Sequence, residues 1–141
     1  MNPILKNVLA IIAGIIAGSM VNMGLINLGY GLIPLEGIDP NNLDDLAKVM
    51  PTLEAKYFIF PFLAHAMGTL VGVGVAAAIA GWQNIKYALY FGVLYLLGGI
   101  AAAVMIPAPT WFLVVDLGLA YLPMAWLGGT IAAKLFSTSS N

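Results

Sequence analysis

Four long apolar runs, separated by polar or proline-containing segments, constrain this chain more than any other feature. They cover residues 4–33, 57–80, 87–106 and 112–136. A helix needs about 20 mostly apolar residues to cross the hydrocarbon core of a bilayer, and each run reaches that length. We therefore predict an all-α, polytopic membrane protein with four transmembrane helices, which form one domain over residues 1–141.

Composition also favours lipid as the solvent. The chain is 62% hydrophobic and 8% charged, whereas a soluble domain is nearer half apolar and a quarter charged. So few charged side chains cannot give a soluble domain of this size a polar surface. The first run resembles a signal peptide at its start, but it continues to Ile33, which is too long for a signal core. We interpret it as a retained helix.

Two residue types are missing, and their absence excludes several functions. Without cysteine, the chain can form neither disulfides nor thiolate metal sites. The sequence also contains no arginine, the residue on which bidentate recognition of phosphate and carboxylate leans most heavily. We therefore expect no nucleotide or nucleic-acid partner. The lipid bilayer is the expected environment of the chain.

The segments between the runs predict how the helices connect. Residues 81–86 and 107–111 are so short that the helices they join should be antiparallel neighbours. The remaining connection, residues 34–56, is long. Cytoplasmic segments are enriched in lysine, which favours placing both termini in the cytoplasm and the 34–56 loop outside. The lysines then divide into three inside and two outside: Lys6, Lys86 and Lys134 against Lys48 and Lys56.

A short amphipathic helix is predicted inside the external loop. Asp39 can cap a helix whose first residue is Pro40, the position that proline favours. Pro51 should stop it. Apolar residues then recur at the spacing of one helix face: Leu43, Leu46, Ala47 and Met50. We expect this helix to lie on the outer membrane surface or across the mouth of the bundle, as a cover, as a gate or as a surface that binds a partner.

Small residues recur every four positions along three of the runs. In lipid, such stripes let helix backbones approach closely. The first two helices should therefore meet through two antiparallel glycine stripes, and the fourth helix carries a stripe around one further glycine. The stripes pack within one chain or build an oligomer interface. The glycines concerned are Gly14, Gly18, Gly68, Gly72 and Gly129.

Asp116 is the charged residue that a membrane tolerates least. It lies about 7 Å inward from Trp111, and a charge near the bilayer centre costs about 2.5–3.5 kcal/mol. His65, the only histidine, lies about 12 Å inward from Tyr57 on a helix that enters from the same side. We predict that the two side chains share a hydrogen bond, directly or through one water.

Asn22 and Asn27 reach a similar depth on the first helix, so four residues form a candidate polar cluster. One interpretation is structural: these side chains form hydrogen bonds with one another and so hold the helices together. The other is a small site that binds an ion, relays a proton or orients a polar ligand. One histidine and one carboxylate cannot fill a tetrahedral zinc site, so we predict no metal and no other cofactor.

Pro123 falls in the middle of the fourth run. Proline lacks the N–H that would bond to the Leu119 carbonyl, so it should kink the helix. The kink either sets the helix geometry alone or widens the outer half of the bundle around Asp116. No pair of nucleophile and base is visible in the sequence, so we predict no catalytic residue and no enzymatic activity.

Several stretches of the chain resemble a family of small bacterial integral membrane proteins with four helices. Together with the helix spacing, the resemblance covers nearly the whole chain. It implies a multi-pass protein of the bacterial cytoplasmic membrane and no particular activity. The matching stretches are Gly37-Ile38-Asp39-Pro40, LAHAMGTLVGVGVAAAIAG at 63–81, MIPAPTWF at 105–112 and LPMAWLGG at 122–129.

Two functional hypotheses follow from these features. The first is a structural or interaction protein that packs with itself, as a homo-oligomer, or with a larger membrane complex. The second is a small ion, proton or solute transport module that uses the polar cluster. A transport path would have to continue inward from His65, but residues 71–80 carry no polar side chain. The sequence therefore favours the first hypothesis.

Overall fold

The computed structural model describes residues 1–137, and this part of the chain is built from helices and turns without a strand. Three long helices come first: α1 (Pro3–Leu32), α3 (Ile59–Ala80) and α4 (Ile85–Met105). The last apolar run forms two helices, α5 (Thr110–Leu119) and α6 (Leu122–Ser137). Residues 138–141 of the predicted 1–141 domain lie outside the described residues.

Four stretches are long and apolar enough to cross a membrane: Pro3–Leu32, Ala55–Ala80, Ile85–Met105 and Thr110–Phe136. Their number and positions agree with the four predicted transmembrane helices, so the chain is a multi-pass membrane protein by length and composition. The outward surfaces of α1 and α4 consist largely of exposed aliphatic side chains, as lipid-facing helices require.

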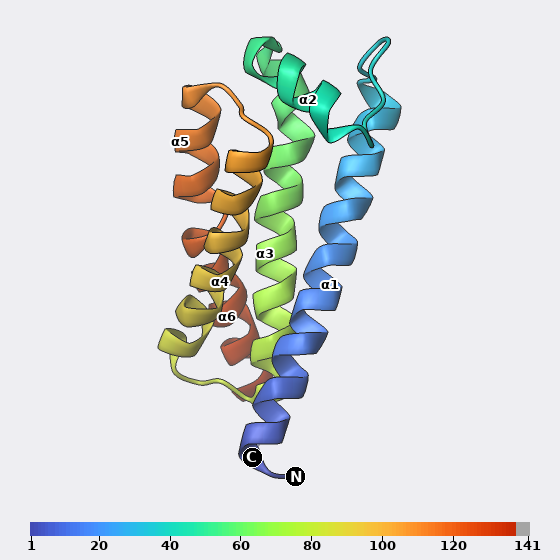
Figure 1. The fold of residues 1–141 in the computed structure, drawn as a ribbon. Coiled ribbons are helices and arrows are strands. Elements are labelled where there is room, and N and C mark those ends of the chain that lie inside the picture. Colours follow the sequence, from blue (N-terminus) through green and yellow to red (C-terminus); the bar gives the residue numbers. More distant parts are fainter. Residues whose placement is uncertain (138–141) are drawn as a thin grey trace.

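The central element of the bundle is α3 (Figure 1). It packs against α1 on one side and against α6 on the other, and α6 also packs against α4. The chain reverses direction after each spanning segment, so the start of α1 and the end of α6 lie at the same end (Figure 1). α1 and α4 share no extensive contact, and an open groove lies between them, above α3.

Local sequence signals explain where the long helices begin and end. The Asn2 side chain accepts a hydrogen bond from the Ile4 N–H, and Pro3 follows as the first helical residue. Asn84 caps α4 in the same way through the Lys86 N–H. At the end of α3, Gly81 adopts φ 75°, the left-handed conformation that glycine tolerates best.

α1 and α3 approach closely through the predicted glycines. A Cβ atom added at Gly14 would lie 2.5 Å from the Gly72 carbonyl oxygen, and one at Gly18 would lie 2.6 Å from that of Gly68. Both distances are too short for any side chain, so these positions need glycine. Gly129 lies elsewhere, in α6, where an added Cβ would collide with Ala88 of α4. Packing within one chain therefore occupies these five positions.

The loop between α1 and α3 contains a helix that differs in its start from the prediction. α2 spans Leu43–Val49, followed by two short 3-10 turns at Met50–Thr52 and Ala55–Phe58. Asn42 is the capping residue, because its side chain accepts hydrogen bonds from the N–H groups of Asp44 and Asp45. The prediction that Asp39 caps the helix was wrong, because its carboxylate instead accepts from the nearby Asn41 N–H.

The fourth spanning segment is broken, which corrects the single helix predicted over 112–136. The interruption falls at Ala120 and Tyr121, and Pro123 lies in the first turn of α6 rather than inside a kinked helix. A proline ring clashes with the carbonyl four residues earlier, so the helix is interrupted before the proline rather than at it. The break separates Asp116 in α5 from the stretch of α6 that packs on α3 and α4.

Candidate functional site

The structure brings together the two ionisable residues singled out within the membrane segments. His65 Nδ1 lies 2.9 Å from Oδ1 and 2.9 Å from Oδ2 of Asp116, which is the hydrogen-bond geometry that their matching depths predicted. Their side chains differ in accessibility, at 22% exposed for His65 and 5% for Asp116. The carboxylate therefore lies behind the imidazole, which is the part of the pair that other molecules can reach.

Two further side chains hold this pair in place. The Tyr121 hydroxyl lies 3.5 Å from Asp116 Oδ2, and the tyrosine ring stacks on the imidazole with centroids 5.9 Å apart. Thr69, one turn after His65, is fully buried and donates from Oγ1 to the His65 carbonyl at 2.8 Å. Tyr121 reaches this position because it lies in the break between α5 and α6.

When Asp116 is ionised, the hydrogen bond determines which nitrogen of His65 carries a proton. An ionised carboxylate only accepts hydrogen bonds, and the two equal distances place the Nδ1–H between the two oxygens of Asp116. In the neutral imidazole the proton is then on Nδ1, and Nε2 presents a lone pair. None of the hydrogen bonds among residues 1–137 involves Nε2. In this protonation state, Nε2 of His65 is an acceptor without a partner among these residues.

His65 lines an open groove of about 560 Å³ between α1 and α4, above α3. Asp116 does not line it. The groove wall is mainly apolar, with side chains such as Met23 and Leu94, but polar groups from three helices and the α5–α6 break also face it. These polar residues are Ser19, Asn22, His65, Thr69, Tyr95 and Tyr121.

Tyr95 closes the end of this groove that is nearer the start of α1. Its hydroxyl donates to the Gly14 carbonyl at 3.0 Å and so bridges α4 to α1. On α1, Gly14 lies between Ile15, which lines the groove, and Ile11, which lines a separate hollow of about 490 Å³ nearer the N-terminus. The hydroxyl occupies the space that the absent side chains of Gly18 and Gly72 leave free. The groove and the hollow nearer the N-terminus are therefore separated.

The predicted polar cluster is only partly assembled. Asn22 lines the groove with His65, and its side chain forms no hydrogen bond within residues 1–137. Asn27 does not join them, because it is exposed on another face of α1. One turn of helix separates Asn22 from Gly18 on the inner face, whereas a further five residues rotate Asn27 well away from that face.

Sequence reasoning missed the contributions of Tyr121, Thr69 and Tyr95 to this site. The signals were present but weak. Thr69 follows His65 by four residues, the spacing at which a hydroxyl can reach a backbone carbonyl of its own helix. A tyrosine deep in an apolar run also needs a partner for its hydroxyl, which applies to both Tyr95 and Tyr121. No periodicity indicated which partner each would find.

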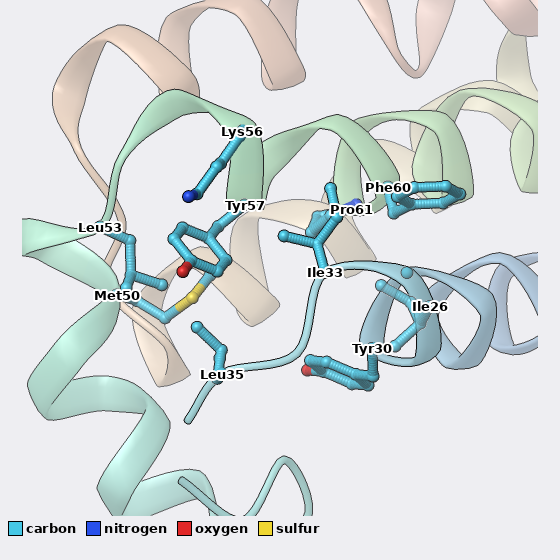
Figure 2. Close-up of a pocket in the computed structure, with 11 residues that line it drawn as sticks. Ile26, Tyr30, Ile33, Leu35, Met50, Leu53, Lys56, Tyr57, Phe60 and Pro61 are labelled. Atoms are coloured by element: carbon cyan, nitrogen blue, oxygen red, sulfur yellow. The ribbon is translucent and has the colours of Figure 1, made fainter. Parts of the chain in front are cut away.

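A second hollow lies under the loop at the other end of α1, but it is smaller and less polar. It measures about 30 Å³. Figure 2 shows the side chains that converge on it from the end of α1, the loop and the start of α3, including Met50, Leu53 and Tyr57. Its one charged residue, Lys56, lies with its ammonium 5.1 Å from the Tyr57 ring centroid. This cavity is best explained by packing of the loop.

Within residues 1–137, no three histidine, aspartate or glutamate side chains lie together as metal ligands. Comparisons with known protein families, with curated proteins and with solved structures found no match to this chain. The function must therefore be argued from the geometry of the groove and of the His65–Asp116 pair.

Proposed function

We propose that this chain is a non-catalytic interaction protein of the bacterial cytoplasmic membrane, and that it engages its partner through the groove over His65. One observation carries the proposal. His65 Nε2 and the Asn22 amide line a groove within the spanning segments, and neither forms a hydrogen bond within residues 1–137. Unsatisfied polar groups are costly in hydrocarbon, so a partner that pairs with them gains binding energy there.

The same geometry favours binding over transport. A path across the membrane would have to pass the Tyr95 bridge between α4 and α1. Beyond that bridge, residues 71–80 supply no polar side chain. The hollow nearer the N-terminus is lined mainly by aromatic and aliphatic residues, and its one amide, Asn7, already accepts a hydrogen bond from Trp82 Nε1 at 2.8 Å. The groove is accordingly closed at the end where Tyr95 bridges α4 to α1.

The orientation and the assembly belong to the same proposal. Both termini lie in the cytoplasm, so the groove opens in the outer half of the membrane. α2 lies at the outer surface, with Leu46 turned inward and buried and with Asp44 and Asp45 near its N-terminus. Copies of the chain, or subunits of a larger complex, pack against the exposed aliphatic faces of α1 and α4.

Site-specific photo-crosslinking tests the proposal in native membranes. A benzophenone amino acid is introduced at Gly98, which lines the groove and has no heavy atom within 4 Å of an added Cβ. The matched control is Gly118 of α5, which is equally open but does not line the groove. We expect the Gly98 probe to form a discrete adduct and the Gly118 probe to label bulk lipid. Identical adducts from both positions would contradict a binding groove.

A further inference from the structure

We infer that the groove binds an uncharged amphiphile whose hydroxyl head group donates a hydrogen bond to His65 Nε2. This inference rests on the proposed binding function and specifies the ligand class of the same site. When Asp116 is ionised, Nδ1–H donates across the 2.9 Å between Nδ1 and the carboxylate oxygens, which leaves the lone pair of the neutral imidazole on Nε2. A hydroxyl is the simplest donor that complements a single neutral acceptor.

The shape of the groove favours a small amphiphile over a partner helix. The Tyr95 hydroxyl bonds to the Gly14 carbonyl at 3.0 Å and crosses the space between α4 and α1. A transmembrane helix lying between α1 and α4 would collide with this bridge. A volume of about 560 Å³ instead falls within the range of about 300–1,000 Å³ that is usual for small-molecule sites.

The charge of the site selects a neutral head group. His65 is the only titratable side chain other than two tyrosines that lines the groove, and no lysine does. An anionic head group would add a second negative charge near Asp116 without any counter-charge. An ammonium carries three N–H donors, of which His65 Nε2 can accept only one, so its remaining donors would lack partners in the mainly apolar groove. An uncharged hydroxyl avoids both costs.

The remaining groove residues suit the rest of such a molecule. Asn22, on the α1 side, has an amide that can donate to the oxygen of the hydroxyl while the hydroxyl donates to His65. The apolar wall, which includes Met23, Leu94 and Ala102, matches an aliphatic chain. Because the groove is open, a molecule dissolved in the bilayer can enter it sideways from the lipid.

The single histidine makes this inference directly measurable. Protein labelled with ¹⁵N-histidine and reconstituted in zwitterionic nanodiscs has only one imidazole, that of His65. Oleyl alcohol is titrated in, with oleyl methyl ether, oleic acid and oleylamine as probes that share its chain. We expect oleyl alcohol to shift the Nε2 resonance in a saturable way and the methyl ether, acid and amine to leave it at the baseline.

Two variants test whether the shift comes from the groove. Gly98→Trp fills the groove at a position where an added Cβ meets no heavy atom within 4 Å, and Asn22→Leu removes the second polar contact. Gly118→Trp is the control outside the groove. We expect both groove variants to weaken or abolish the oleyl alcohol shift, with Gly118→Trp behaving like the unmodified chain. Circular dichroism verifies that each variant is folded.

The outcomes separate this inference from the function on which it rests. An equal shift from the methyl ether, a stronger response to the acid or the amine, or no saturable shift at all would overturn the hydroxyl inference. If the Gly98 photo-probe still forms a discrete adduct in those cases, the binding function stands with another ligand. If the adduct is also absent, the binding function fails as well.

Discussion

At the scale of single residues, the presence or absence of one side chain decides whether two helices can pack closely. Gly72 of α3 faces the Gly14 carbonyl of α1 and also adjoins the Tyr95 hydroxyl of α4. One missing side chain therefore makes room for contacts from two other helices. Gly24 of α1 is the opposite case, because an added Cβ there meets no heavy atom within 4 Å.

This contrast gives the first prediction. Gly72→Ala should destabilise the fold by about 1–3 kcal/mol, the usual cost of overpacking, because the new methyl group displaces Tyr95 or separates α1 from α3. Gly24→Ala should leave stability unchanged or slightly raised, since alanine favours the helix more than glycine does. Thermal unfolding in detergent measures both variants. Equal midpoints for the two would show that α1 and α3 do not meet at Gly72.

A second prediction concerns the partner of His65. Asp116→Asn keeps an oxygen that can accept the Nδ1–H, so the variant should fold with stability close to that of the original chain. Asp116→Leu leaves that donor unpaired in a buried place, which costs about 1–3 kcal/mol. Unfolding midpoints of the two variants, compared in the same detergent, test this difference. A similar large loss in both would mean that the ionised carboxylate, not hydrogen bonding alone, stabilises the bundle.

At the scale of elements, capping residues and helix breaks determine where each helix begins and ends. The periodicity of apolar residues predicts these boundaries poorly. α2 begins after Asn42, whose side chain accepts from Asp44 and Asp45 N–H, whereas Asp39 bonds only within its own turn. Asn42→Ala should therefore cost about 1 kcal/mol locally and speed hydrogen exchange across residues 43–49 about fivefold. Asp39→Ala is the control, and faster exchange of α2 in that variant would instead make Asp39 the capping residue.

At the scale of the whole molecule, the orientation in the membrane is the first quantity to test. The chain has no cysteine, so single cysteines can be introduced without a background signal. With the cytoplasmic N-terminus that lysine placement predicts, Asn42→Cys should react with an impermeant maleimide on intact cells. Asn2→Cys should react only after the membrane is permeabilised. The reverse pattern would place the groove in the inner half of the membrane.

Much of the architecture could be predicted from the sequence, because segment length and hydropathy locate the membrane spans without any knowledge of tertiary contacts. The positions of the four spans and the approach of Gly14 to Gly72 needed only the 3.6-residue period and the direction of each helix. The groove could not be predicted from the sequence, because it depends on where α1 and α4 do not pack against each other. The Tyr95 bridge and the place of Tyr121 result from packing between distant residues, which no local pattern encodes.

The central claim is that the groove over His65 holds a partner. Native mass spectrometry of the chain, purified in mild detergent from its own membranes, tests it most directly. We predict a bound species at fixed stoichiometry on the unmodified chain and on Gly118→Trp, and its loss from the groove-filling Gly98→Trp variant. The same bound species on all three proteins, or on none of them, would contradict the claim.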